Sequence, residues 1–184
     1  ILGVGERLHE VSPHLRADPR PVGGSLFRIH RDVRFARDKR PYKTAAGIQF
    51  RHARSRDAHA PGLYLHIEPG ACFVGLGVWR PDPPALRAIR ERLVDDPEGW
   101  RRAVEPSSFR GVFELGGEAL ARTPRGFDPG HPLVEDLKRK DFVAMAPVED
   151  AFVTSPALVD DFLAMTRAGT PLLRYLCGAL DVPF

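Results

Sequence analysis

The chain has 184 residues, enough for one domain with a single sizeable core, and its 43 % hydrophobic and 28 % charged residues are ordinary for a globular protein. No apolar run approaches the roughly 18 residues that span a bilayer, so we expect neither a membrane helix nor a membrane partner. Cys72 and Cys177 lie in apolar patterns typical of buried free thiols, which favours a reducing, cytoplasmic compartment over a disulfide framework.

The first predicted element is a helix over residues 1–11, where apolar side chains recur at helical spacing. A loop rich in proline and glycine follows over residues 12–24. Alternation of apolar and polar residues predicts two short strands, over 25–31 and 47–51, and the basic stretch between them is expected to continue as a loop.

The clearest predicted element is a hairpin over residues 62–79, because Pro69 and Gly70 suit the two central positions of a tight turn. With that turn, Leu65 pairs with Val74, and the neighbouring pairs on the same face are also apolar. The register is therefore internally consistent, with one face of the hairpin directed to a core.

The opposite face of this hairpin carries Tyr64, His66 and Glu68, and glycines leave space beside Tyr64. Two interpretations remain open: a polar and aromatic rim forms a shallow pocket over a glycine floor, or the glycines let another element pack closely. His66 and Glu68 could supply two metal ligands, but a third would have to come from elsewhere. A hydrogen-bonded pair is therefore favoured, and we predict no metal site.

Further helices are predicted wherever a capping residue precedes proline at the first helical position. Glycine commonly ends helices, so the fourth of them is expected to end at Gly169 and a separate helix to follow it. The predicted starts are Asp82–Pro83, Asp96–Pro97, His131–Pro132, Ser155–Pro156 and Thr170–Pro171.

Three more strands are predicted, over residues 111–115, 119–122 and 142–148. Strands come first along the chain and helices are then mixed with strands, without regular alternation. This order predicts a single domain over 1–184 with an α+β fold. We expect a mostly antiparallel sheet with a central hairpin at about 62–79 and several short helices packed on it.

Residues 28–43 hold most of the electrostatic character of the chain. They contain seven basic and two acidic residues, a local charge of +5, whereas the whole chain carries only +3. A concentrated basic patch indicates an anion-binding surface, in which Asp32 and Asp38 could orient the arginines. The structural alternative is an Arg–Asp network that fixes an irregular loop onto the sheet.

The four lysines of this arginine-rich chain fall as two pairs, Lys39 with Lys43 and Lys138 with Lys140. A compact ammonium group acts differently from a planar guanidinium, so the pairs indicate positions where an amine is required. If the fold brings the two pairs together, the hypothesis of an anion site gains support.

The common catalytic templates are not met, because the chain lacks a glycine-rich phosphate loop, a nucleophile elbow and a C-x-x-C pair. His66 is the candidate catalytic acid or base, since it is the one histidine on the polar face of the hairpin. The candidate ligand-binding residues are Arg28, Arg31, Asp32, Arg34, Lys39, Tyr42, Lys43, Tyr64, Trp79, Arg80, Lys138 and Lys140.

The basic segment resembles the signature of DUF2461, a widespread bacterial family of unknown function, in the pattern R-x-x-R-D-x-R-F-x-x-D-K-x-x-Y over residues 28–42. The resemblance implies no substrate, cofactor or reaction. It does imply that a further helical segment with aromatic residues precedes residue 1. Similar blocks lie at 61–70, 75–83, 123–133 and 137–144.

The leading hypothesis is a cytoplasmic domain that binds a small phosphorylated or carboxylated ligand, with enzymatic activity left open. In it the basic residues supply positive charge and Tyr42, Tyr64 and Trp79 supply stacking surfaces. One alternative is a nucleic-acid-binding module in which basic and aromatic residues follow a backbone. Another is a structural or interaction protein whose Arg–Asp network only stabilises the fold. The cofactor and the oligomeric state stay unknown.

Overall fold

Six antiparallel strands of the described residues form one sheet in the order β1-β2-β3-β4-β6-β5. The computed structural model describes residues 1–31, 34–35, 37, 39–54 and 60–184. The α+β prediction with a mostly antiparallel sheet is therefore confirmed. The strands are β1 (Leu15–Arg16), β2 (Ala46–His52), β3 (Gly62–Ile67), β4 (Phe73–Val78), β5 (Glu114–Gly116) and β6 (Phe142–Pro147).

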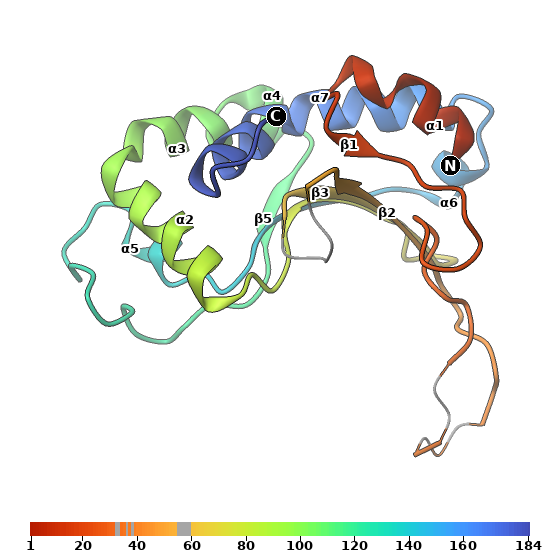
Figure 1. Ribbon diagram of the computed structural model, residues 1–184, viewed down its shortest axis with the longest axis horizontal. Coiled ribbons are helices and arrows are strands. Elements are labelled where there is room, and N and C mark those ends of the chain that lie inside the picture. Colours follow the sequence, from red (N-terminus) through yellow and green to blue (C-terminus); the bar gives the residue numbers. More distant parts are fainter. Residues whose placement is uncertain (32–33, 36, 38, 55–59) are drawn as a thin grey trace.

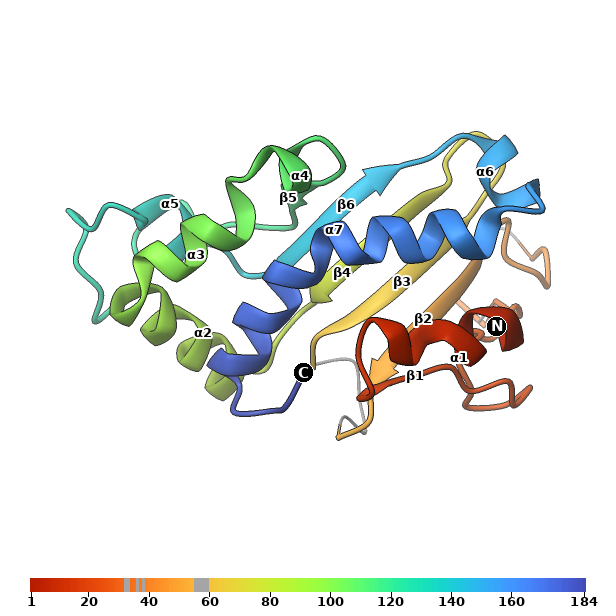
Figure 2. The ribbon, with the colours of Figure 1, turned by 90° about the horizontal axis from the view of Figure 1, so that it is seen from above.

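Helices cover one face of this sheet (Figure 1), and α7 lies across its central strands with α1 beside it (Figure 2). The helices α2, α3 and α4 each contact α7. Across the described residues, no helical stretch combines the length and the apolar character that crossing a bilayer requires. The helices are α1 (Leu2–Arg7), α2 (Pro83–Asp95), α3 (Pro97–Val104), α4 (Ser107–Arg110), α5 (Val134–Leu137), α6 (Asp150–Thr154) and α7 (Leu158–Ala179), with a 3-10 turn at Leu8–Glu10.

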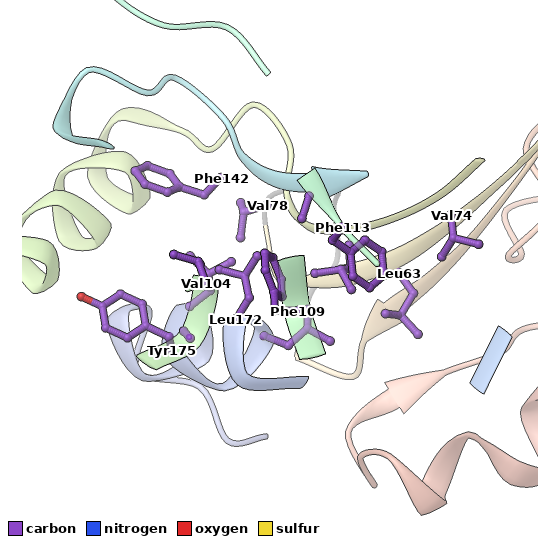
Figure 3. Packing of buried hydrophobic residues seen from close by; sticks show 14 of the residues in the cluster. Leu63, Val74, Val78, Val104, Phe109, Phe113, Phe142, Leu172 and Tyr175 are labelled. Carbon is purple, nitrogen blue, oxygen red and sulfur yellow. The ribbon is translucent and has the colours of Figure 1, made fainter. Parts of the chain in front are cut away.

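The main core lies between the covered face of the sheet and these helices (Figure 3). Leu63 of β3 and Val74 of β4 are buried there, as are Phe109 of α4 and Leu172 of α7. Each such side chain, fully buried, stabilises the fold by about 1.5–3 kcal/mol. The opposite face of the sheet therefore has no part in this core and is available for the polar residues of the hairpin.

The predicted hairpin is confirmed in both position and register. Leu65 pairs with Val74, and on the other face Tyr64 pairs with Gly75. The Ala71 N–H donates to the Glu68 carbonyl oxygen at 2.8 Å, which closes the predicted turn. Period-two patterning and turn chemistry thus specify this part of the sheet.

The prediction of two C-terminal helices is wrong, because α7 continues through both Gly169 and Pro171. Gly169 faces β4, and a Cβ atom there would overlap the Leu76 side chain, so this glycine permits close packing of the helix on the sheet. Proline removes one helical hydrogen bond and usually breaks a helix. Here nine buried residues hold α7 against the core on both sides of the proline, and this packing outweighs the local penalty.

Two of the predicted strands are reduced to isolated bridges among the described residues. The segment 25–31 meets β2 through a bridge between Leu26 and Ile48, and the segment 119–122 contributes a bridge from Ala119. The strand predicted over 111–115 starts later, as β5, because α4 and the turn after it occupy the preceding residues. Alternating patterns this short do not distinguish a strand from an extended connection.

Candidate functional site

The basic segment forms an arm that projects from the sheet on the side away from α7 (Figure 1). The segment that enters the arm and the segment that leaves it run antiparallel. His30 forms an antiparallel bridge with Tyr42, and the Arg31 N–H donates to the Pro41 carbonyl oxygen at 2.8 Å. We call the described residues of 28–43 the basic arm.

Most side chains of the basic arm lie in solvent. Phe35 is 95 % exposed and Tyr42 is 56 % exposed. Asp32 and Asp38 lie outside the described residues, so their predicted role as partners of the arginines stays a prediction. The exposed cations are Arg28, Arg34, Arg37, Lys39, Arg40 and Lys43, and Arg31 is partly buried.

A hydrogen-bonded chain on the uncovered face of the sheet joins the two ends of the basic arm. Thr44, which follows the arm, donates to Glu68 at 2.7 Å. Glu68 contacts His66 Nε2 at 3.2 Å, and His66 Nδ1 contacts the Tyr64 hydroxyl at 3.2 Å. Phe27, which precedes the arm, packs on the Tyr64 ring with 5.8 Å between ring centres. We call Thr44, Glu68, His66 and Tyr64 the clasp.

The electrostatics of the clasp favour an ionised carboxylate. The bonds from Thr44 and then from His66 lower the pKa of Glu68, whereas burial raises the pKa of Tyr64. Both ring nitrogens of His66 are engaged, and its ring stacks on Phe73 at 4.8 Å. His66 therefore has a structural role in the clasp, and its catalytic role stays a prediction. Among the described residues, no group of three or more His, Cys, Asp or Glu could hold a metal.

The two glycines of the predicted floor, Gly75 and Gly77, differ. A Cβ atom at Gly77 would overlap the backbone of β6, so this glycine permits close packing, whereas a Cβ atom at Gly75 would make only an ordinary contact, 3.8 Å from the Tyr64 Cβ. The Tyr64 ring packs on a third glycine. A Cβ atom at Gly47 would overlap the Tyr64 hydroxyl, so the ring lies directly over this glycine. Trp79 follows β4, four residues beyond Gly75, the partner of Tyr64. At about 3.3 Å per residue it lies about 13 Å further along the strand. Tyr64 and Trp79 therefore do not line one pocket, as the stacking hypothesis required.

Trp79 instead lies at a second site, at the far corner of the sheet, where a pocket of about 430 Å³ opens. The guanidinium of Arg80 stacks over the Trp79 ring, 4.7 Å from its centre. Two predicted ligand-binding residues, Arg80 and Lys140, line this corner pocket. The lining residues are Arg80, Pro81, Leu86, Arg90, Glu118, Leu120, Lys140 and Asp141.

Arg90 is the residue of the corner pocket that the sequence prediction missed. Its side chain belongs to α2 and is 8 % exposed. Among the described residues, its one hydrogen bond runs from Nη2 to the Arg139 carbonyl oxygen at 2.9 Å, and its buried Nε has no partner. Burial lowers the pKa of this guanidinium, but arginine keeps its charge at neutral pH. The sequence does indicate that Arg90 is buried, because it follows Leu86 by four residues and therefore lies on the inward face of α2.

The carboxylates of the corner pocket are already engaged. Glu118 pairs with Lys140 at 2.8 Å. Asp141 is buried and accepts the backbone N–H groups of Arg80 at 2.7 Å and of Glu118 at 3.0 Å. The first of these bonds holds Arg80 in the left-handed region, with φ of 48°. Asp141 thus joins the two loops that carry Arg80 and Glu118.

Lys138, a further candidate, does not line this pocket. Its ammonium pairs with Glu135 at 2.6 Å. The basic arm and α2, which supplies Leu86 and Arg90 to the corner pocket, lie toward opposite ends of the molecule in both views (Figure 1 and Figure 2). Along β6, Pro147 marks the arm end and Phe142 the corner end, about 16 Å apart. The two lysine pairs therefore do not come together, and the candidate residues divide between two sites.

Comparison with known proteins gives one match. The sequence model described as "Conserved hypothetical protein (DUF2461)" matches residues 1–175. No curated protein matches the chain, and no solved structure does.

Proposed function

The chain belongs to the DUF2461 family, and we propose that it binds a small phosphorylated or carboxylated ligand in the corner pocket, in the cytoplasm. One observation carries the proposal: Arg90 is a buried cation that lines a pocket and has no carboxylate partner among the described residues. Two further cations, Arg80 and Lys140, line the same pocket.

The cost of burying charge supports this proposal. A buried ion without a partner loses several kcal/mol of hydration, and an anion with well-placed acceptors restores part of it. The volume of about 430 Å³ falls within the usual range of small-molecule sites, and Leu86 and Leu120 supply apolar wall. His66 lies at the other end of the sheet, so the proposal assigns binding to this pocket and no catalytic step to His66.

Thermal unfolding with a panel of small phosphates and carboxylates tests the proposal. A ligand at about 100 times its dissociation constant adds about 2.7 kcal/mol and should raise the midpoint by about 5–10 °C. The shift should vanish in Arg90→Leu and persist in Arg87→Leu, a matched control because Arg87 lies on the same helix with its side chain exposed. A flat panel on folded protein would favour the structural or interaction alternative.

Nucleic-acid binding is a second candidate, supported by the basic arm. Six of its seven cations are exposed, and Phe35 at 95 % exposure offers a surface on which a base could stack. If six phosphates are neutralised, the logarithm of the affinity for a single-stranded oligonucleotide should fall against the logarithm of salt concentration with a slope of about −4. Charge removal in Arg37→Ala combined with Arg40→Ala should reduce the slope. Absence of salt-dependent binding would remove this candidate.

A further inference from the structure

A second pocket, of about 400 Å³, lies among α3, α4, β5 and α5, and it shares no lining residue with the corner pocket. We call it the α4 pocket. We infer that it binds an organic ammonium ion that carries an apolar stem and an oxygen acceptor. This inference goes beyond the proposed small-anion function and does not depend on it, because the two ligands occupy different pockets.

The floor of the α4 pocket is apolar. Val104 of α3, Phe109 of α4 and Phe113 after it line the pocket, and all three are buried (Figure 3). Leu115 of β5 and Leu133 line it as well. A hydrocarbon stem that enters the pocket would leave water and contact these side chains, which is favourable for apolar surface. The floor therefore favours a ligand with an apolar stem but does not set its charge.

The rim of the α4 pocket is acidic. Three carboxylates line it, those of Glu105, Glu114 and Asp136, against one cation, Arg110. Arg110 lies 4.0 Å from Glu105, and Asp136 pairs at 2.8 Å with Arg139, which lies outside the lining. Glu114 is exposed and has no ion pair or hydrogen bond to its side chain from the part of the chain that the structure describes. The rim therefore carries one uncompensated negative charge, which favours a cation over an anion.

Trp100 adds a hydrogen-bond donor to the α4 pocket. This residue lines the pocket, is 1 % exposed, and packs edge-on against Phe142 and Tyr175. Its indole N–H has no acceptor among the described residues. Among those same residues, Arg90 Nε is the one fully buried side-chain polar atom without a partner, so the Trp100 N–H retains a contact with solvent. Since the core encloses the rest of Trp100, that contact opens into the pocket.

The donor, the rim and the floor together specify the ligand. An ammonium group has three donors and no acceptor, so it suits the free carboxylate of Glu114. An indole N–H only donates, so it requires an oxygen acceptor on the ligand. A lysine residue of a peptide has the ammonium, the stem and a carbonyl oxygen, and a small amine with a hydroxyl or carbonyl oxygen has them as well.

A titration followed by two-dimensional proton–nitrogen NMR tests the inference, because the two tryptophans of the chain, Trp79 and Trp100, give two indole N–H signals. Acetyl-lysine methylamide at neutral pH should shift the Trp100 signal, since a hydrogen bond to the ligand oxygen deshields the indole proton. The Trp79 signal should stay in place. Trp79→Phe, at an exposed position, assigns the two signals.

The norleucine analogue of this probe keeps the stem and the carbonyl groups but lacks the ammonium, so we expect it to bind about three- to fivefold more weakly. Fivefold corresponds to about 1 kcal/mol, the upper end for an exposed ion pair. Glu114→Gln should remove this difference. Glu98→Gln is the matched control and should keep it, because Glu98 is an exposed carboxylate of α3 outside the pocket.

Three results would overturn the inference: a Trp100 signal that does not move in folded protein, equal affinity for the norleucine analogue, or a preference that persists in Glu114→Gln. Comparison with 6-aminohexanol, a free amine with a stem and an oxygen, distinguishes the source of the ammonium. Tighter binding of the lysine derivative would assign the pocket to a lysine residue of a peptide, and the reverse to a free amine. Arg90→Leu should leave these titrations unchanged, so the inference and the small-anion function stand or fail separately.

Discussion

The basic arm and the corner pocket differ in how they hold positive charge. The described residues of the arm include seven cations, six of them exposed. The corner pocket carries three, but one of them, Arg90, is buried without an ion-pair partner among the described residues. The density of positive charge along the sequence favours the arm as the ligand site. The energetic cost of burying Arg90 favours the corner pocket.

This difference is physical. Exposed charges remain hydrated and screened, so an arginine on the arm costs little and contributes about 0–1 kcal/mol through any ion pair. A buried guanidinium costs several kcal/mol unless an anion accompanies it. A buried charge is therefore harder to explain by solubility or composition than an exposed cluster, and it is stronger support for a ligand site.

The largest expected effect is on the framework of the corner pocket. Asp141→Ala would leave the backbone N–H groups of Arg80 and Glu118 without their acceptor. Because an unsatisfied buried donor costs about 1–3 kcal/mol, we expect a loss of about 2–4 kcal/mol in the free energy of unfolding, measured by urea denaturation. A change below about 0.5 kcal/mol would show that the two loops do not depend on Asp141.

Arg90→Leu should have a smaller effect, of the opposite sign. Removal of a buried charge without an ionic partner relieves a desolvation cost, while the bond to the Arg139 carbonyl is lost. We expect the free energy of unfolding without ligand to stay constant or to rise by about 1–2 kcal/mol. The same urea denaturation measures it. A loss of more than about 2 kcal/mol would mean that Arg90 stabilises the fold, which would weaken its assignment to a ligand.

The sequence predicts the regular parts of this fold because local rules determine them. The register of the hairpin follows from alternation and one turn, and α2 begins after Asp82, whose side chain accepts the Ala85 N–H at 2.9 Å. The helix α7 is mispredicted because a packing contact at Gly169, distant in sequence, overrides the local signals of glycine and proline.

The candidate sites are less predictable for the same reason. Arg80 and Lys140 are identified as candidates from the sequence, but their meeting in one pocket depends on the pairing of β4 with β6. Arg90 differs from the many other arginines only in burial, which is a tertiary property. The basic arm is evident from composition, yet its projection from the sheet on the side away from α7 is visible only in three dimensions.

The clasp should respond to acid. The pKa of Glu68 is lowered in the folded protein, so its stabilising contribution is present above the unfolded value of about 4.3 and is lost as pH falls through the folded value. The Lys43 N–H donates to the Ile29 carbonyl oxygen in the adjoining part of the arm. Once pH falls below about 4, we expect this amide to exchange faster, relative to its intrinsic rate, than at higher pH. Glu68→Gln should abolish this pH dependence. An unchanged acid response in Glu68→Gln would assign it to another group.

The smallest expected effect is at Arg34 of the basic arm, and it bears most directly on the comparison. Arg34 is exposed, so Arg34→Ala should change the free energy of unfolding by less than about 0.5 kcal/mol. Urea denaturation of this variant beside Asp141→Ala places both regions on one scale. If Arg34→Ala instead costs 2 kcal/mol or more, the basic arm is part of the stabilising framework. The contrast between a solvated arm and an integrated corner would then be wrong, and the Arg–Asp network would be the better account of the basic signature.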